Sequence, residues 1–233
     1  MTPETVAVVG GGSWGTAFAN LLASRGADVR LAFRDPDLAH ATAAARENVR
    51  YLPGVALEEG VEPVALGPPA LVGAAIVAVA VPSRHFAAAL DACVAGLEPG
   101  AVLVSLAKGL DPATGWRLSR VLAARVDGDP ARVAALSGPN HAEEIARGTP
   151  AASVVAAESA ELCRRLQAAL STPRFRVYAN ADLVGVELCA AAKNVIAIAA
   201  GASDGLGYGD NAKAALMTRG LAEMSRLGAA SAP

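Results

Sequence analysis

Short apolar runs alternate with alanine-rich helical segments over the first 180 residues. The runs typical of strands cover Val6–Val9, Val29–Phe33 and residues 74–81, 102–106, 133–136, 153–156 and 175–178. Helical patterns lie between them at residues 15–25, 37–48, 83–95 (with Ser83 as the expected cap) and 158–170. The run at 74–81 is apolar without alternation, which is typical of a strand buried on both faces. This alternation predicts an α/β fold, a Rossmann-type doubly wound sheet that is mostly parallel with helices on both faces.

The hydrophobic pattern changes after residue 180. Residues 181–201 contain many alanines and almost no turn signals, a second helical pattern covers residues 211–227, and no strand is expected after Tyr178. We therefore expect a dinucleotide-binding domain at residues 1–180 and part of an all-helical substrate or catalytic domain at residues 181–233. Two helices bury little core by themselves, so this part is expected to pack on the first domain, on a partner chain or on further residues.

Composition narrows the function classes. The chain is 53% hydrophobic with a formal net charge of −2, which argues against a nucleic-acid-binding protein and a basic membrane-surface protein. The N-terminus lacks the pattern of a signal peptide, and Glu187 and Lys193 within the apolar run at 186–202 argue against insertion in lipid. The scattered Cys93, Cys163 and Cys189 are expected to be buried free thiols, and no metal site is expected. These features predict a cytoplasmic protein.

A glycine-rich turn follows the first expected strand. Gly10, Gly12 and Gly15 form the pattern G-x-G-x-x-G where a strand runs into a helix, which is the context that dinucleotide binding requires. The first glycine permits the tight turn, the second lets a pyrophosphate approach the backbone, and the third lets the helix pack close to the strand. A glycine-rich turn without a ligand is the alternative. The position favours NAD or NADP as the cofactor.

The end of the second strand bears on the choice between these cofactors. An acidic side chain there binds the ribose hydroxyls of NAD, whereas an arginine suits the 2′-phosphate of NADP. Arg34 occupies this place, which favours NADP or dual use, but Asp35 follows it and a shift of one residue would reverse the preference. The alternative for Arg34 is an ordinary solvated surface charge.

Further motifs occur in a fixed order along the chain. They are GGGSWGTA at 10–17, YLPG at 51–54, VPS at 81–83, KGL at 108–110, SGPNHAEE at 137–144, ARGTP at 146–150, KN at 193–194 and TRGLAE at 218–223. In this order and spacing the set closely resembles the bacterial NAD(P)-dependent glycerol-3-phosphate dehydrogenases. The resemblance covers essentially the whole chain.

The resemblance implies the reduction of dihydroxyacetone phosphate to sn-glycerol 3-phosphate with NAD(P)H, which supplies the backbone of phospholipids. It makes Lys193 the catalytic acid–base, and Asn194 beside it can either orient substrate or cap a neighbouring backbone group. A homodimer through the helical part is also implied. Beyond the glycines, the implied cofactor contacts are Ser13, Trp14, Phe33, Arg34, Tyr51, Lys108 and Ala142. The implied substrate contacts are Lys108, Gly138 and Asn140, the last at a position where family members often have a small hydroxyl residue.

The two lysines suit this chemistry. Lys193 lies in mid-helix, where its i±3 and i±4 neighbours are small or apolar, so we expect a desolvated amine whose pKa is lowered. A lysine that extends from a helix to water is the alternative. Glu187 precedes Lys193 by six residues, so the two are not expected to pair. Lys108 follows the strand at 102–106, at the sheet edge where ligands bind in open α/β sheets; a solvated loop lysine is its alternative.

Family members continue beyond the residues matched here. The continuation carries a glycine-flanked aspartate and a Ser-Arg-Asn segment that binds the substrate phosphate. We therefore expect this polypeptide to bind NAD(P)H but to turn over weakly or not at all. Two other interpretations stay open, a catalytically incompetent NAD(P)-binding module and a related 3-hydroxyacid or 6-phosphogluconate type of dehydrogenase.

Overall fold

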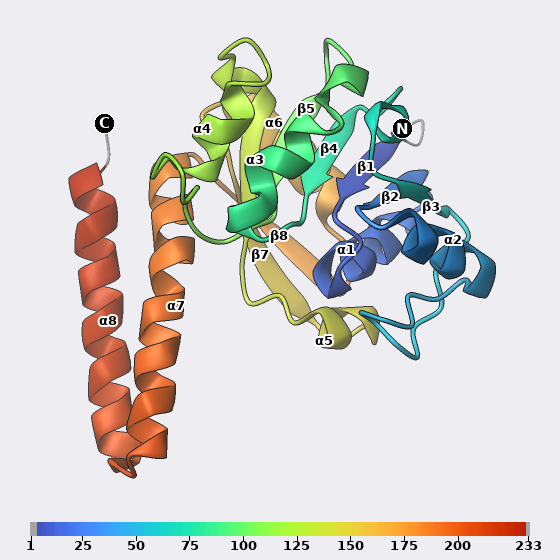
Figure 1. The fold of residues 1–233 in the computed structure, drawn as a ribbon. Coiled ribbons are helices and arrows are strands. Elements are labelled where there is room, and N and C mark those ends of the chain that lie inside the picture. Colours follow the sequence, from blue (N-terminus) through green and yellow to red (C-terminus); the bar gives the residue numbers. More distant parts are fainter. Residues whose placement is uncertain (1–3, 232–233) are drawn as a thin grey trace.

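The computed structural model describes residues 4–231 as an eight-stranded sheet between layers of helices, from which two long helices extend (Figure 1). The sheet order is β3-β2-β1-β4-β5-β6-β7-β8, in which the first six strands are parallel, β7 is antiparallel to β6, and β8 is parallel to β7. The strands are β1 Val6–Val9, β2 Val29–Phe33, β3 Val61–Ala65, β4 Ile76–Val79, β5 Val102–Ser105, β6 Val133–Ser137, β7 Ala151–Ala156 and β8 Phe175–Asn180. This arrangement confirms the predicted doubly wound, mostly parallel sheet.

Helices cover both faces of the sheet. They are α1 Ser13–Ala23, α2 Pro36–Ala45, α3 Ser83–Asp91, α4 Leu118–Ala123, α5 Ala142–Ala146, α6 Ala160–Leu170, α7 Leu183–Gly205 and α8 Gly209–Ser231, with 3-10 turns at Pro68–Ala70, Val94–Gly96 and Pro130–Arg132. Ser159 and Asp182 cap α6 and α7 through their side chains. Ser83 was expected to cap α3, but Pro82 is the N-cap residue and Ser83 is the first residue of the helix.

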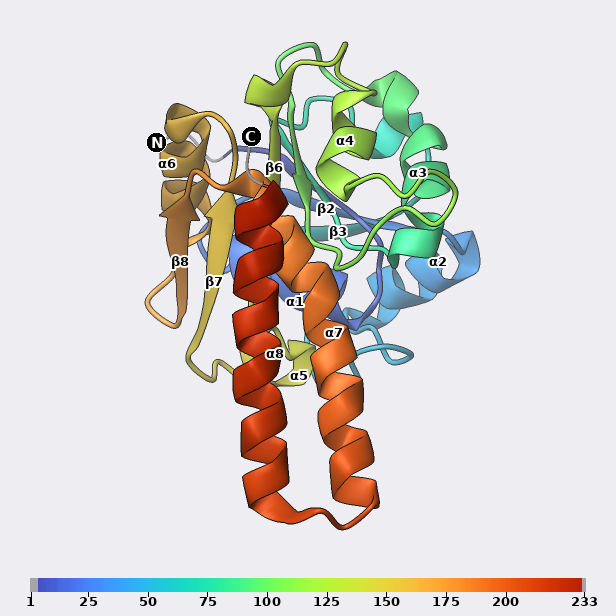
Figure 2. The ribbon, with the colours of Figure 1, turned by 90° about the vertical axis from the view of Figure 1, so that its left-hand side faces the viewer.

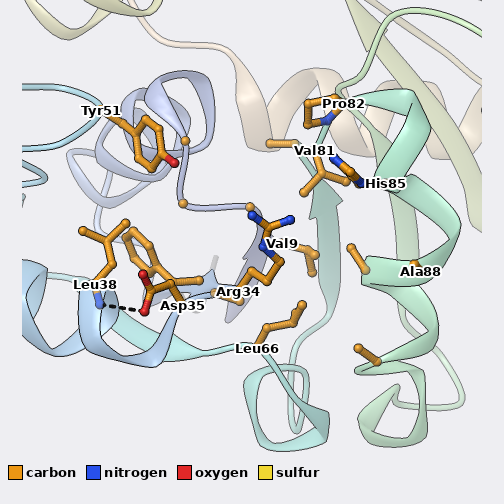
Figure 3. A pocket seen from close by; sticks show the side chains of 18 of the residues that line it. Val9, Arg34, Asp35, Leu38, Tyr51, Leu66, Val81, Pro82, His85 and Ala88 are labelled. Atoms are coloured by element: carbon orange, nitrogen blue, oxygen red, sulfur yellow. Dashed lines mark hydrogen bonds between the residues drawn. The ribbon is translucent and has the colours of Figure 1, made fainter.

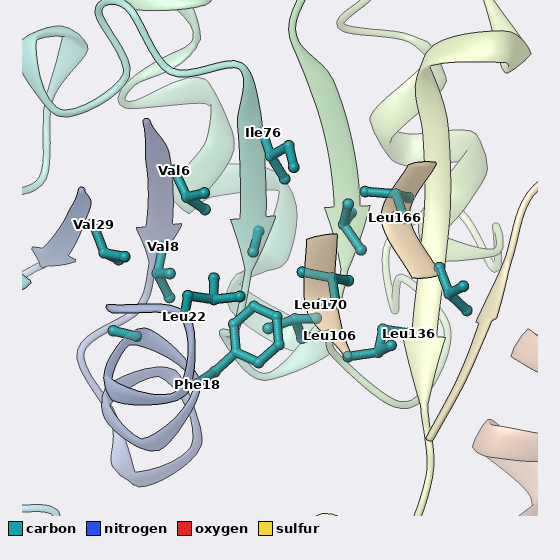
Figure 4. Packing of buried hydrophobic residues seen from close by; sticks show 14 of the residues in the cluster. Val6, Val8, Phe18, Leu22, Val29, Ile76, Leu106, Leu136, Leu166 and Leu170 are labelled. Atoms are coloured by element: carbon teal, nitrogen blue, oxygen red, sulfur yellow. The ribbon is translucent and has the colours of Figure 1, made fainter. Parts of the chain in front are cut away.

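The central strands are buried on both sides, as their continuous apolar sequences predict. Successive residues of β1 point to different cores: Val8 belongs to the core that also contains Phe18 of α1 and Leu166 of α6, whereas Val9 belongs to the core on the opposite face, which contains Phe86 of α3. Figure 4 shows the first of these cores from close by. Each fully buried large apolar side chain contributes about 1.5–3 kcal/mol relative to its exposed state. The sheet therefore holds the loops at its carboxyl edge on a rigid base.

The sequence pattern did not indicate strand β3. Its residues include Glu62 and Pro63, and only Val61 is buried. Proline removes a ladder donor and is tolerated where a strand lies at the edge of a sheet, and β3 pairs with β2 alone. The strand therefore forms because the neighbouring strand provides its hydrogen bonds, and not because its own sequence is strongly apolar.

Helices α7 and α8 form an antiparallel hairpin that projects beyond the sheet (Figures 1 and 2). Its base is attached through Leu183, which packs with Ala135 of β6 and Ala156 of β7. Farther along, Val195 and Ile198 are 66% and 74% exposed. Among the described residues, α7 is the one helix long and apolar enough to cross a membrane. Length and composition alone do not separate a membrane span from an apolar helix that packs in an assembly.

The three cysteines are free. Cys93 and Cys163 are buried, as predicted, whereas Cys189 on α7 is half-buried. Burial and, to a smaller extent, the charge of Asp91 raise the pKa of the Cys93 thiol to about 11. This thiol is therefore inert at neutral pH.

Candidate dinucleotide and substrate site

The glycine turn between β1 and α1 has the geometry that its sequence predicts. Gly10 has a φ of 117°, and a Cβ there would lie 2.7 Å from Cγ1 of Val81 and 2.8 Å from the oxygen of Ala80. A Cβ on Gly15 would lie 1.9 Å from the oxygen of Gly10, so only glycine lets α1 begin so close to the strand. A Cβ on Gly12 would meet no atom within 4 Å. The space over Gly12 is therefore open where a pyrophosphate would approach the helix N-terminus.

Gly11 is a fourth essential glycine that the pattern did not identify. A Cβ at this position would lie 2.2 Å from the ring of Phe33, which is only 2% exposed. Phe33 lines the cavity beside the turn, as its predicted cofactor contact requires. It is also a member of the buried core, and its ring supports the turn from the core side. The consecutive glycines thus serve two purposes, one toward the ligand space and one toward the protein.

A cavity of about 650 Å³ opens at the carboxyl ends of β1, β2 and β4, next to the glycine turn (Figure 3). This volume lies within the range of small-molecule sites. Arg34 and Asp35 lie on the β2 side of the cavity, and Val81, Pro82 and His85 lie on the opposite side. Apolar side chains, including Leu38, Leu66 and Ala88, provide walls that suit a planar aromatic base. The residues present therefore fit an adenine dinucleotide.

The structure separates the roles of the two charged residues that follow β2. Asp35 caps α2, because its Oδ1 accepts hydrogen bonds from the backbone N–H groups of Asp37 and Leu38 at 3.1 and 3.4 Å. Its Oδ2 lies 3.9 Å from Nη1 of Arg50. A carboxylate engaged in this way is less available to ribose hydroxyls. Arg34 is exposed and lines the cavity, so the positive side chain is the one with freedom to bind a ligand.

Arg50, Arg84 and His85 also line this cavity, and sequence reasoning missed all three. The guanidinium of Arg50 lies 5.3 Å from the ring centroid of Tyr51, a predicted cofactor contact that also lines the cavity. Nε of Arg84 donates to Nε2 of His85 at 3.1 Å. A signal was present for Arg50, since it directly precedes Tyr51 in the motif. The cavity therefore carries more positive charge than the motifs indicate.

The segment that carries Tyr51 is tied to the glycine turn by side-chain hydrogen bonds. The amide of Asn48 donates to the oxygen of Gly11 at 3.0 Å and to Oγ1 of Thr16 at 2.8 Å. The Ser13 hydroxyl donates to the backbone oxygen of Tyr51 at 2.6 Å. Ser13 was predicted to contact the cofactor; it is not among the residues that line the cavity, its hydroxyl holds the segment of Tyr51 in place, and its contact with the cofactor stays a prediction.

Trp14 and Ala142, both predicted to contact the cofactor, lie outside this cavity. The Trp14 ring packs against Phe18 and Phe175, with centroid separations of 5.4 and 6.3 Å. Ala142 is buried in a small cluster with Ala17 and Leu52, against which Trp14 packs. Nε1 of Trp14 is buried and has no hydrogen-bond partner within residues 4–231. Their roles toward a cofactor stay predictions.

Two lysines from distant parts of the sequence lie within electrostatic reach of each other. Lys108 lies in the loop after β5, at the carboxyl edge that also carries the glycine turn, and it is half-buried. Burial lowers the pKa of the Lys108 amine, and the nearby charge of Lys193 on α7 lowers it further. The fold therefore brings together the two residues that were singled out for substrate chemistry.

The predicted desolvation of Lys193 is wrong. Its side chain is exposed, as is Ala197; Cys189 and Ile196 are only half-buried, and Ala190 is the one buried residue among these neighbours. The i±3 and i±4 spacing defines one face of a helix but does not determine what covers that face. The middle of α7 has passed the edge of the sheet, so small apolar neighbours there do not remove water. Of the two amines, Lys108 is the desolvated one.

The segment after β6 is closely packed and leaves one polar atom without a partner. A Cβ on Gly138 would lie 2.6 Å from both the oxygen of Ala152 and Oγ of Ser153, so glycine is required. The Ser153 hydroxyl donates to Oδ1 of Asn140 at 2.7 Å, while Nδ2 of Asn140 is buried without a partner within the described residues. A buried, unpartnered donor costs about 1–3 kcal/mol, so Nδ2 is the unsatisfied donor of this segment, and the substrate contact of Asn140 stays a prediction.

Glu187, in the second turn of α7, is a buried carboxylate whose partners the sequence did not indicate. It does not pair with Lys193, as expected from the spacing. Instead it accepts hydrogen bonds from Nη1 of Arg117 and from the backbone and hydroxyl of Ser119. These residues lie at the start of α4, so the bonds connect α7 to the sheet region.

Comparison with known proteins matches this chain to two models of one family. Residues 5–163 match the NAD-dependent glycerol-3-phosphate dehydrogenase N-terminus, and residues 182–233 match the C-terminus of the same family. Glycerol-3-phosphate dehydrogenase [NAD(P)+] of Moorella thermoacetica is 49% identical over 227 residues, which is 97% of this chain and 67% of that protein.

Two solved structures show the same fold. The glycerol-3-phosphate dehydrogenase of Coxiella burnetii is 37% identical and has a TM-score of 0.90, covering 98% of this chain and 69% of its own. The Saccharomyces cerevisiae enzyme of the same name is 26% identical and has a TM-score of 0.82, covering 97% of this chain and 70% of its own. The chain thus spans about two thirds of the length of these relatives.

Proposed function

Because this chain belongs to the NAD-dependent glycerol-3-phosphate dehydrogenase family, we propose that it interconverts dihydroxyacetone phosphate and sn-glycerol 3-phosphate with NADPH or NADH. The observation that carries the proposal is the open glycine turn at the sheet edge that also holds the half-buried Lys108, whose amine lies within electrostatic reach of Lys193. One part of this edge suits a dinucleotide and the other suits an anionic, carbonyl-bearing substrate.

The reaction requires a hydride on the carbonyl carbon and a proton on the carbonyl oxygen. When bound, the reduced nicotinamide supplies the hydride. We assign the proton to Nζ of Lys193, whose ammonium donates to the oxygen as negative charge develops there. In the reverse direction the neutral amine accepts the proton of the substrate hydroxyl. The exposed side chain has the freedom to reach a substrate that lies between α7 and the sheet edge.

Lys108 has the complementary task of holding negative charge. Its half-buried ammonium attracts the carbonyl oxygen or the phosphate more strongly than a solvated one would, because the surroundings screen it less. Burial and the Lys193 charge lower the pKa of Lys108, and a bound anion would raise it, because an anion favours the charged form of the amine. Nδ2 of Asn140 and the backbone at Gly138 provide further donors toward the substrate.

A preference for NADPH over NADH is part of the proposal, and the charged residues of the cavity support it. Arg34 is free to face an adenosine 2′-phosphate, Arg50 lines the same cavity, and the capping role of Asp35 occupies the usual ribose acceptor. An arginine–phosphate contact is a strong charge-assisted bond. Arg34→Ala should weaken NADPH binding roughly tenfold or more and NADH binding much less. Fluorescence titration of both cofactors measures this, and equal losses would remove Arg34 from cofactor discrimination.

The chain's lysine content allows a clean test of the chemistry. Lys108, Lys193 and Lys213 are its three lysines, and Lys213 pairs with Asp204 and Asp210 on the hairpin, outside the site. Lys193→Met should leave NADPH affinity unchanged and abolish formation of glycerol 3-phosphate. Product analysis in a reaction with equal concentrations of enzyme and NADPH measures this. Lys213→Met is the matched control and should retain the wild-type rate. Equal rates in both variants would remove Lys193 from the mechanism.

One observation favours a second candidate function, a non-catalytic NAD(P)-binding module. Lys193 is exposed, whereas an efficient proton donor is usually shielded from water. The same experiment separates the two candidates. NADPH binding without any product in a single turnover would support the module, whereas product formation supports the dehydrogenase.

Three further assignments belong to the same proposal. Residues 1–180 form the dinucleotide-binding domain and residues 181–233 contribute to the substrate domain, which agrees with the sheet ending at Asn180. The helical part forms a homodimer. The exposed apolar residues of α7 and α8 support this assignment, and light scattering tests it. The protein acts in the cytoplasm and supplies glycerol 3-phosphate to phospholipid synthesis.

A further inference from the structure

We infer that Glu187 is a positioning residue for the reaction: its carboxylate fastens the helix that carries Lys193 to the loop that carries Lys108, and so sets the separation of the two amines. The inference rests on the proposed function, because it concerns the same two lysines. The exposed Lys193 and the half-buried Lys108 lie on separate elements, so a contact between those elements must keep the two amines at a constant distance.

The attachment consists of several hydrogen bonds on one buried carboxylate. Glu187 is 7% exposed, and its oxygens accept from Nη1 of Arg117 at 2.9 Å, from the Ser119 N–H at 2.7 Å and from the Ser119 hydroxyl at 2.5 Å. Nη1 of Arg117 also donates to the Ser119 hydroxyl oxygen at 2.9 Å. A buried carboxylate is stable only when such partners replace its lost hydration. The network therefore has one geometry and little freedom to slide.

On the sheet side, the network is continuous with the Lys108 loop. Leu110 and Arg117 form an antiparallel bridge, and the N–H of Asp111 donates to the oxygen of Trp116 at 2.9 Å. The Asp111 carboxylate then accepts from the N–H and hydroxyl of Thr114 at 3.1 and 2.6 Å, which closes the end of the loop. Lys108 thus lies on one arm of a closed hairpin whose other arm ends at the Glu187 partner. A shift of Arg117 would shift Lys108 with it.

On the α7 side, a rigid helix connects Glu187 to Lys193. Six residues at 1.5 Å per residue place them about 9 Å apart along the axis. The base of α7 also packs through Leu183 and Val186, but apolar contacts allow small rotations that a hydrogen-bonded carboxylate does not. Among the described residues, Glu187 is the one α7 side chain that forms a hydrogen bond to the sheet region. It is therefore the contact that determines the rotation of α7 and the direction of Lys193.

Stability alone does not require a charged residue at the buried position 187. A well-packed apolar residue in place of a buried ion pair is often neutral or stabilising, whereas loss of one partner is strongly destabilising. Glu187→Gln keeps the shape and one acceptor but weakens the bonds to Arg117 and Ser119. Ser119→Ala keeps the ion pair and removes only the hydroxyl. The two variants weaken the hydrogen bonds between α7 and the start of α4 to different extents and leave the apolar packing of α7 in place.

Amine cross-linking tests the separation directly. We expect a short amine-reactive cross-linker to join Lys108 to Lys193 in the wild-type chain, and mass spectrometry quantifies the product against the mono-modified peptides. We expect Glu187→Gln to reduce the Lys108–Lys193 cross-link and kcat several-fold, and Ser119→Ala to reduce both less. NADPH affinity should stay at the wild-type value in both variants. The matched control is Glu223→Gln, which breaks surface ion pairs on α8 with Arg219 and Arg226, and it should behave as wild type.

The outcomes separate this inference from the proposed function. A folded Glu187→Gln variant, with normal circular dichroism and NADPH affinity, that keeps the wild-type cross-link yield and kcat would overturn the positioning role. A wild-type chain that forms the cross-link but makes no glycerol 3-phosphate would refute the proposed function. The effect of Glu187→Gln on the cross-link yield would then still test whether Glu187 positions the two amines. Absence of the Lys108–Lys193 cross-link in the wild-type chain would refute both.

Discussion

The nucleotide-binding sheet and the α7–α8 hairpin follow opposite rules of construction. The sheet buries both faces of its central strands, with separate cores formed by alternate residues of β1, β4 and β5. The hairpin buries its base and leaves large apolar residues such as Ile198 and Leu221 at 74% and 60% exposure. The sheet thus contains its own stabilising contacts, whereas the hairpin depends on what it packs against. The site uses both, since the cofactor cavity lies on the first and Lys193 on the second.

The largest expected effect sharpens this contrast in stability. Leu166→Ala removes a fully buried side chain of α6 (Figure 4), and should lower the free energy of unfolding by about 2–5 kcal/mol. Ile198→Ala removes an exposed side chain of similar size on α7 and should change it by less than about 0.5 kcal/mol. Urea denaturation followed by circular dichroism measures both. A large loss in Ile198→Ala would show that this face of α7 is packed in solution.

The next effect distinguishes two glycines of the same turn. Gly15→Ala places a Cβ 1.9 Å from the oxygen of Gly10, so the turn must open and stability should fall by about 1–3 kcal/mol. Gly12→Ala places a Cβ in open space and should leave the melting temperature close to wild type. Its methyl group nevertheless occupies the space of the pyrophosphate, so NADPH affinity should fall by roughly tenfold or more. Full affinity in a folded Gly12→Ala variant would contradict the predicted position of the cofactor.

The smallest expected effect concerns the coupling between the two regions. The Lys193 charge lowers the pKa of Lys108, so Lys193→Met should let that pKa rise. At pH values below the pKa, a higher pKa leaves less neutral amine, and the acylation of Lys108 should slow by a few-fold. Peptide mass spectrometry across a pH series measures the rate. Lys213 serves as internal reference, because its ion pairs with Asp204 and Asp210 raise its pKa for reasons independent of Lys193. An unchanged Lys108 rate would mean that the two amines do not interact.

Local sequence rules predicted the sheet, the glycine turn and the two helices of the hairpin, but they did not predict which faces of the hairpin are covered. Continuous apolar strands and G-x-G-x-x-G each depend on residues that are neighbours in the chain, so their consequences can be read directly. Strand β3 was missed because its pairing with β2, and not its own composition, makes it a strand. The exposure of Lys193 was mispredicted because helical periodicity identifies a face without identifying its cover. Glu187 was correctly left unpaired with Lys193, but nothing near it in sequence points to Arg117 and Ser119.

The sequence by itself determined the fold class, the position of the dinucleotide turn, the family and the two lysines, because each is written in adjacent residues or in the order of motifs. Only the tertiary structure decided that Asp35 caps a helix while Arg34 stays free, that Lys108 and not Lys193 is the desolvated amine, and that Glu187 connects the two elements that carry them. These facts depend on which surfaces meet and on how much water remains between them. Burial and long-range hydrogen bonds are properties of the packed chain, so no local pattern contains them.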